Sequence, residues 1–316
     1  AQWCGGVPAK RLVQYPKAWK ENPVLTSDAT PKSDIAVLYS LSLRDRDRVS
    51  EGYKDQMGIA QMLSDLHWQY DFIMPSQLDE GFLKQYHTVV LASVQHLSRA
   101  QADALRKFVT GGGNLIVSAY AGREDENNQP ASWLDDLLKG AEGVARPVGK
   151  GKVFFSSKPI GLPNYEPDAI GKEDSWKEAR SRVDHSLLVK ALTETGTERF
   201  GFRPVEIPDY ILVNQWKQKV DGKERLYIPL LNATYARQLH KVTDFPSLKT
   251  DDAFPLIGEK VVFVVKTAPI AAAWAISPEF EGSRPVEVKP LENGEYEITL
   301  PAGTLKAHAF VVLELQ

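Results

Sequence analysis

The stretch RKFVTGGGNLIVSAYAGREDENN, residues 106–128, decides the fold. It contains the end of an amphipathic pattern, three consecutive glycines at 111–113, and the apolar run NLIVS at 114–118. In phosphate-binding loops, glycines follow a strand and lead into a helix, whose N-terminus receives the anion. Here the glycines follow a helix and lead into a strand, and no GK[ST] follows them. We therefore predict a helix stop with a tight turn, and not a phosphate cradle.

The same alternation of strand and helix extends outward from this stretch. Short apolar runs alternate with two helical patterns. One helical pattern covers residues 52–68, and the other is amphipathic, covers residues 98–113 and has Ser98 as its N-cap. Such runs are typical of buried parallel strands, and they occupy residues 34–40, 70–76, 87–94 and 114–120. The alternation predicts a doubly wound α/β domain with a parallel sheet.

From about Phe202 the pattern changes to short strand-like runs separated by turn residues. The sequences DGK at 221–223 and ENGE at 292–295 are hairpin signals. About seven short strands without helices predict an all-β sandwich. We therefore expect an extended N-terminal arm or linker at 1–33, an α/β domain at 34–204 and a β-sandwich at 205–316.

Composition restricts the classes of partner and cofactor. The 316 residues carry a formal net charge of −3, too balanced to indicate nucleic acid or an anionic membrane as the main partner. No apolar run approaches the roughly 20 residues that span a bilayer. Cys4 is the only cysteine, which excludes an internal disulfide and zinc sites built from several cysteines. The compartment stays open, with a secreted or periplasmic location slightly favoured over the cytoplasm.

Several of these runs together resemble a known family. They are similar to the middle domain of family 42 glycoside hydrolases, the β-galactosidase trimerisation domain. The residues that carry the resemblance are the series IAVLYSLSLRDR, YDFIMPS, HTVVLASV and GGGNLIVSAYAGREDENN, followed by GKGKVFFSS. The resemblance covers about residues 34–316. It implies a flavodoxin-like sheet of the class I glutamine amidotransferase-like superfamily, a C-terminal sandwich and a homotrimer. It implies no nucleotide, flavin or metal cofactor.

The chain departs from that family in its catalytic part. In the family, a TIM barrel placed before this domain carries the acid/base and nucleophile glutamates. A barrel needs about 250 residues, whereas 33 residues precede Asp34. We therefore expect a non-catalytic, assembly or carbohydrate-associated portion of a β-galactosidase-like hydrolase system, with a homo-oligomer or a barrel-containing partner. Two alternatives stay open: a fragment or processed product of a full hydrolase, and a free-standing amidotransferase-like enzyme with a recast pocket.

Residues that could carry chemistry gather after the third and fourth strands. Members of the superfamily that are amidotransferases or peptidases use a cysteine at a strand-to-helix elbow, with a histidine and an acid nearby. The elbow is expected here at 118–122, where no cysteine stands. Ser118 lacks the G-x-S-x-G context of a serine elbow, so we interpret it as the end of a strand. A polar pocket near the carboxyl ends of the strands, or simply hydrogen-bonded loop ends, would be formed by His96, Tyr120, Arg123, Glu124 and Asn127.

Two tryptophans in the expected sandwich are candidates for carbohydrate contact. Trp216 and Trp274 have the ring type that stacks on sugars, although packing into the core is the simpler interpretation of each. No two histidines stand four residues apart, so the sequence contains no H-E-x-x-H motif. We expect no metal site, and glycan remains a possible ligand.

Overall fold

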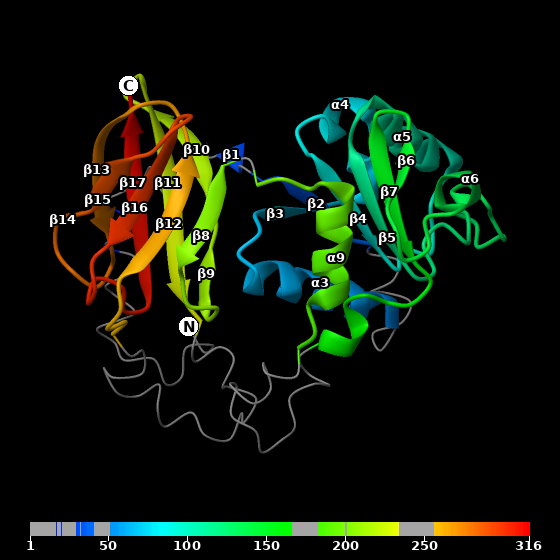
Figure 1. Ribbon diagram of the computed structural model, residues 1–316, viewed down its shortest axis with the longest axis horizontal. Coiled ribbons are helices and arrows are strands. Elements are labelled where there is room, and N and C mark those ends of the chain that lie inside the picture. Colours follow the sequence, from blue (N-terminus) through cyan, green and yellow to red (C-terminus); the bar gives the residue numbers. More distant parts are fainter. Residues whose placement is uncertain are drawn as a thin grey trace, which may run out of the picture. The chain divides into compact units, whose positions relative to one another are not determined.

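The computed structural model describes residues 17, 20, 30–31, 33–40, 51–165, 183–199, 201–233 and 256–316. The chain divides into two compact units (Figure 1). One unit is Ser33–Arg199 and the other combines Phe200–Gln316 with Ala1–Lys32.

Within the described residues, the unit Ser33–Arg199 holds a six-stranded sheet of order β3-β2-β4-β5-β7-β6. Every pairing is parallel except that of β6 with β7. Taken in chain order, the five parallel strands are arranged 2-1-3-4-5, the flavodoxin-like order. The predicted doubly wound sheet is confirmed. Its strands are β2 (Ile35–Leu38), β3 (Tyr70–Ile73), β4 (Thr88–Ala92), β5 (Asn114–Ser118), β6 (Arg146–Val148) and β7 (Gly151–Ser156).

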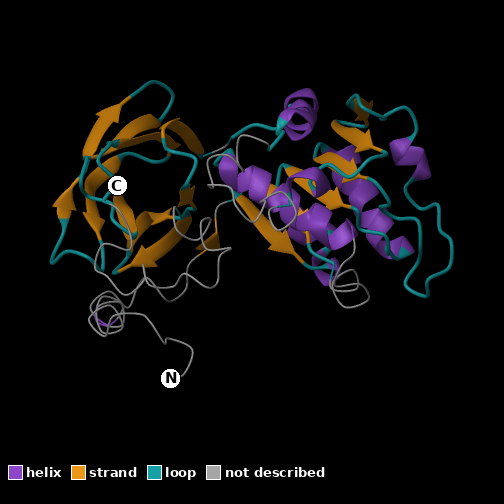
Figure 2. Ribbon diagram, turned by 90° about the horizontal axis from the view of Figure 1, so that it is seen from below, coloured by secondary structure: helices purple, strands orange, loops and turns teal. Residues whose placement is uncertain are grey.

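Helices cover both faces of this sheet (Figures 1 and 2). One apolar cluster joins Leu83, Leu105 and Leu137 to one face, and a second joins Ile59 and Leu188 to the other. Burying both faces explains why the strands are continuous apolar runs and do not alternate. The helices are α3 (Glu51–Asp65), α4 (Glu80–Leu83), α5 (Arg99–Gly111), α6 (Asp135–Leu138) and α9 (Ser186–Thr195), with 3₁₀ turns η3 (Pro75–Gln77) and η4 (Leu162–Asn164).

Helix α5 begins and ends as its sequence predicts. Ser98 accepts a hydrogen bond from the N–H of Gln101 in a capping box. At the other end Gly112 has a φ of +123° and its N–H returns to the carbonyls of Phe108 and Val109. A Cβ on Gly113 would lie 2.2 Å from the Phe108 ring, so only glycine lets that ring lie against the main chain. The predicted helix stop is confirmed.

The second unit is a sandwich of antiparallel sheets in the described residues. One sheet has seven strands, in the order β1-β10-β11-β17-β13-β14 with β9 beside β11, and the other has the order β15-β16-β12-β8. Residues 201–233 and 256–316 contain no helix (Figure 2). The predicted sandwich is confirmed, with strands β1 (Thr30–Pro31), β8 (Phe202–Glu206), β9 (Ile211–Val213), β10 (Trp216–Val220), β11 (Lys223–Asn232), β12 (Val261–Lys266), β13 (Ile270–Ile276), β14 (Arg284–Pro285), β15 (Glu287–Pro290), β16 (Glu295–Leu300) and β17 (His308–Leu315).

Both hairpin signals lie where the sheets turn. Asp221 and Gly222, with φ of +49° and +82°, join β10 to β11. Asn293 and Gly294, with φ of +57° and +74°, lie between β15 and β16. Positive φ at both residues suits the twist of the flanking strands. The expected boundary at 204 falls inside β8, which pairs with β12, and β1 of the expected arm pairs with β10.

Candidate functional site

The carboxyl edge of the parallel sheet is the place where α/β sheets usually bind ligands. Here Asp55 of α3 occupies it. Its Oδ2 accepts hydrogen bonds from the hydroxyls of Ser93 and Ser118, each at 2.6 Å, at the ends of β4 and β5. Its Oδ1 accepts from the main-chain N–H of Gly161 at 2.6 Å and of Leu162 at 3.2 Å. One carboxylate therefore ties α3 to two strands and to the loop after β7.

This carboxylate is fully buried, at 0% exposure. Burial raises the pKa of Asp55, while the hydrogen bonds from Ser118, Ser93, Gly161 and Leu162 oppose that rise. Four donors, none of them a charged side chain, thus compensate for the lost hydration of the acid. We interpret the arrangement as a structural anchor.

Two strained residues mark the same edge. Ser93 after β4 and Ala119 after β5 have φ of +50° and +46°, a conformation that costs free energy outside glycine. An exposed hydroxyl there, next to a base, would suggest a nucleophile. Instead Ser93 and Ser118 are buried, and both hydroxyls donate to Asp55. Ser118 ends β5 as predicted, whereas the sequence reasoning missed Asp55 and Ser93.

The residues expected to form a polar pocket meet in separate pairs. His96 Nε2 lies 3.0 Å from Glu124 Oε2, and Gln95 donates to the other oxygen of Glu124 at 2.6 Å. The guanidinium carbon of Arg123 lies 5.4 Å from the centre of the Tyr120 ring. The contacts of Glu124 tie the loop after β5 to the loop after β4, whereas Arg123 and Tyr120 belong to the same loop. Ligand binding by these side chains stays a prediction.

Asn127 lies elsewhere in the same loop. Its N–H donates to Asp125 Oδ1 at 2.8 Å, and the N–H of Gln129 donates to the same oxygen at 2.9 Å. This is an Asx turn on an exposed segment, a common way for Asp to stabilise its own loop. The contacts of Asn127 are therefore local ones.

The two candidate tryptophans lie in one row across the seven-stranded sheet. Cross-strand register places Trp216 beside Tyr227, Tyr227 beside Val312, and Val312 beside Trp274. The Trp216 ring stacks on Tyr227 at 6.3 Å between ring centres and meets Phe310 edge-on at 5.8 Å. The Trp216 ring is therefore occupied by packing on both neighbours.

Trp274 has a polar neighbour. The guanidinium carbon of Arg225 lies 5.4 Å from the centre of its ring, and Glu314 holds that guanidinium at 2.9 and 3.1 Å. The side chains of both tryptophans are partly buried. Sugar stacking at Trp216 and Trp274 stays a prediction. Trp274 has a guanidinium beside its ring, whereas Trp216 has aromatic neighbours.

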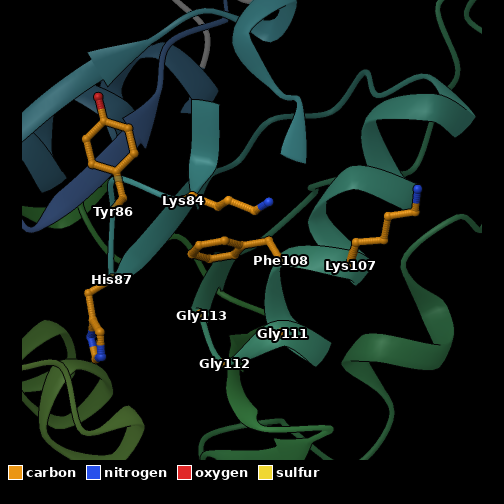
Figure 3. Close-up of a pocket in the computed structure, with 8 residues that line it drawn as sticks. All are labelled: Lys84, Tyr86, His87, Lys107, Phe108, Gly111, Gly112 and Gly113. Carbon is orange, nitrogen blue, oxygen red and sulfur yellow. The ribbon is translucent and has the colours of Figure 1, made fainter. Parts of the chain in front are cut away.

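A cavity of about 310 Å³ lies at the opposite, amino-terminal edge of the parallel sheet (Figure 3). It opens between the ends of α4 and α5, before the start of β4. The three glycines of the stretch that decides the fold form one wall, which the sequence did not predict. The lining residues are Lys84, Tyr86, His87, Lys107, Phe108, Gly111, Gly112 and Gly113.

Two of these lining side chains are committed to other contacts. The Tyr86 hydroxyl donates to Asp71 at 3.1 Å. Burial lowers the pKa of His87, and the nearby Glu198 charge opposes that shift. In Figure 3 both side chains point away from Lys84 and Lys107. The remaining lining residues are the two lysines, Phe108 and the three glycines.

Among the described residues, no group of three or more His, Cys, Asp or Glu side chains is arranged to hold a metal ion. Within the same part of the chain, no helix combines the length and the apolarity needed to cross a membrane.

Known proteins resemble this chain in one domain and in its overall fold. Residues 47–158 match the family model described as GLMA-like, second domain. This part of the chain is therefore similar to a GLMA-like second domain. The match lies within the α/β unit and includes Asp55, Ser93 and Ser118, and it ends before Gly161 and Leu162. No curated protein matches the chain.

Solved structures with the same fold extend over both units. They include a β-galactosidase from Bacillus circulans sp. alkalophilus (13% identity, TM-score 0.51, 92% of this chain) and Gan42B, a GH42 β-galactosidase from G. stearothermophilus (14%, 0.51, 94%). A β-galactosidase from Rahnella sp. R3 is similar (11%, 0.50, 91%). The chain spans 42% of the length of each. The predicted resemblance is confirmed as one of fold.

Proposed function

We propose that this chain is a non-catalytic, assembly-forming portion of a glycoside hydrolase system of the β-galactosidase kind. The observation that carries the proposal is the paired architecture. An α/β unit followed by a sandwich aligns with β-galactosidases over 91–94% of this chain but only 42% of theirs. In this proposal the catalytic carboxylates lie outside this sequence, either upstream in a longer chain or on a partner.

The contacts of the acidic residues support this function. A glycosidase needs two carboxyl groups on either side of one glycosidic bond, roughly 5–9 Å apart across a cleft. Asp55 is buried among four donors, Glu124 binds His96 and Gln95, and Asp125 stabilises its own turn. Each of these carboxylates has a structural task, and none is paired with a second one across a cavity.

Assembly is tested by the mass of the purified chain in solution, measured by light scattering after gel filtration. The resemblance implies a trimer, so we expect a mass three times 35.2 kDa. A mass of one chain at every concentration, without association with any barrel-containing hydrolase from the same source, would end the proposal.

A second measurement separates the two forms of the proposal. An immunoblot of the source with antibody against this chain gives the native size. A band near 35.2 kDa indicates that the chain acts with a separate catalytic partner. A band heavier by a barrel of about 250 residues or more indicates a longer hydrolase, with its catalytic groups on the same polypeptide.

A further inference from the structure

The chain passes between its two compact units twice, after residue 32 and after residue 199. At the first passage, Pro31 lies opposite Trp216 in the pairing of β1 with β10 in the sandwich unit. The N–H of Asp34 donates to the carbonyl of Gln69 in the α/β unit at 3.2 Å. Two residues therefore separate the anchored positions of the two units. Such a segment spans about 10 Å when it is fully extended.

The second passage is shorter still. The guanidinium of Arg199 donates to the main-chain carbonyls of Leu66 and His67 in the α/β unit, each at 2.6 Å. The carbonyl of Gly201 accepts a hydrogen bond from the N–H of Lys266 in the sandwich unit at 3.2 Å. One residue, at position 200, therefore separates the two anchored positions. In the part of the chain that the structure describes, no helix or strand runs across either passage.

Both passages are anchored on one short turn, residues 66–69 between α3 and β3, which we name the shared turn. The Gln69 carbonyl binds Asp34, and the first two carbonyls of the turn bind Arg199. The guanidinium carbon of Arg199 also lies 3.9 Å from the centre of the Trp68 ring. Burial lowers the pKa of Arg199 to about 10, and the nearby charge of Asp34 opposes that shift. The chain therefore enters and leaves the α/β unit at neighbouring points.

Arginine has the chemistry that this anchor requires. Its guanidinium is a planar fork of N–H donors, so it can bind two carbonyls at once while its face stacks on an aromatic ring. The two carbonyls follow the end of α3, where main-chain acceptors lack helical partners. His67, with a φ of +53°, turns the chain out of the helix at that point. Lysine at position 199 would keep the charge but lose the fork.

We propose that the two passages form a hinge between the units, with the shared turn as its fixed side and Arg199 as the positioning residue that clamps the second passage. Two short passages that start from neighbouring points allow rotation about the line that joins them and resist rotation in other directions. Compact units of one chain move relative to one another unless a large apolar interface holds them, and hinges are commonly a few residues at the ends of elements. This inference does not depend on the proposed assembly.

The experiment measures the distance between two nitroxide labels by double electron–electron resonance. The full chain carries Cys4→Ser and two label sites, Lys107→Cys on α5 and Lys219→Cys on β10, both at exposed positions. Labelled chain is diluted with unlabelled chain, so that distances within one chain are measured in an oligomer as well. The width of the distance distribution reports the range of orientations that the units adopt.

Arg199→Met is the variant that releases the clamp. We expect a distance distribution about twofold broader than in the wild type, because the second passage then lacks its anchor on the shared turn. Arg199→Lys is expected to broaden it as well, since an ammonium has no planar fork. Arg203→Met is the matched control and is expected to leave the width unchanged, because Arg203 is an exposed residue of β8 that binds Glu295 at 3.4 Å within the sandwich unit.

A further variant tests the passage itself. Insertion of Gly-Gly-Gly after position 200 lengthens the second passage without touching the contacts of Arg199, and it is expected to give the broadest distribution. It keeps the proposal testable if Arg199→Met does not fold, which circular dichroism shows. Three results overturn the proposal: an unchanged width in both Arg199 variants, equal broadening in Arg203→Met, or a wild-type distribution as broad as that of the insertion. Chain mass is not part of this readout, so failure here leaves assembly untouched.

Discussion

The two edges of the parallel sheet use polar groups in opposite ways. At the carboxyl edge, Asp55, Ser93 and Ser118 are buried and bonded to one another. At the amino edge, Lys84 and Lys107 border a cavity of about 310 Å³. Ligand sites of α/β sheets usually lie at the carboxyl edge. In the part of the chain that the structure describes, the Asp55 network occupies that edge, and the cavity lies at the other.

The difference shows that a fold does not determine where chemistry occurs. Strain of the kind seen at Ser93 and buried acids are often found at active sites. Here the same features connect α3 to the strand ends, so they contribute to stability. The predictions below test this contrast through free energies of unfolding.

Replacing the buried acid is expected to have the largest effect. Asp55→Ala leaves two main-chain N–H groups and two hydroxyls of the anchor without their acceptor. We expect a loss of about 3–5 kcal/mol in the free energy of unfolding, because unpaired buried donors cost about 1–3 kcal/mol each and partial relaxation recovers some of this. Urea denaturation followed by circular dichroism measures it.

Asp55→Asn is the control for that variant. The amide oxygen can accept from Gly161 and Leu162, while its NH₂ donates to the hydroxyls of Ser93 and Ser118, which also act as acceptors. We expect a change of about 1 kcal/mol or less. Equal losses for the two variants would contradict the description of Asp55 as a hydrogen-bonded anchor.

Close backbone contact gives the next largest effect. A Cβ on Gly58 would lie 2.0 Å from the carbonyl oxygen of Gly161, the residue whose N–H binds Asp55. Gly58→Ala therefore pushes α3 away from the loop after β7, and we expect a loss of about 2–3 kcal/mol. Thermal unfolding checks it. A variant as stable as the wild type would show that the carboxyl edge is not closely packed.

The pH dependence of Asp55 has a defined sign. Burial raises its folded pKa above the unfolded value, so between the two the native state binds more protons than the unfolded state. Stability from this group is therefore greatest below the ordinary aspartate pKa of about 3.9 and falls as pH rises through the folded pKa. Asp55→Asn removes this contribution.

The measurement is the difference in unfolding free energy between wild type and Asp55→Asn as a function of pH. The free energy of unfolding of the wild type is expected to fall relative to that of Asp55→Asn as pH rises from about 3.9 through the folded pKa of Asp55. At the amino edge, burial lowers the pKa of His87, so its contribution has the reverse sign and is lost as pH falls below about 6.5. A difference curve that is flat with pH would contradict the raised pKa of Asp55.

Sequence patterns predicted the elements of both units because those patterns are local. The order of helix, glycines and strand at 98–118 identified the stop after α5, and positive φ at Asp221 and Gly222 follows from their turn chemistry. The Asp55 anchor escaped because its partners are 38 to 107 residues away. One signal was present: Asp55 shares a helix face with Ile59 and Met62, where an apolar residue is expected.

The cavity escaped prediction for a different reason. A glycine that ends a helix and a glycine that borders free space have the same local pattern, and only the surrounding elements distinguish them. Gly111 and Gly113 are two residues apart, yet one faces open space and the other lies under the Phe108 ring. Among the side chains expected to form a pocket, His96 meets Glu124 and Arg123 meets Tyr120, and ligand binding there stays a prediction.

The smallest expected effect is a gain in stability at the open edge. Gly111 is the last residue of α5, and a Cβ there meets nothing within 4 Å. Gly111→Ala reduces the freedom of the unfolded chain without a clash, so we expect a gain of about 0.4–1 kcal/mol. Gly196 ends α9 with a φ of +73°, and alanine at that position is expected to destabilise by about 1 kcal/mol because of the left-handed backbone. Opposite signs for these two helix-end substitutions would show that free space and backbone conformation, and not helix position, decide what a glycine does here. A loss at Gly111 as large as that at Gly196 would contradict the free space beside Gly111.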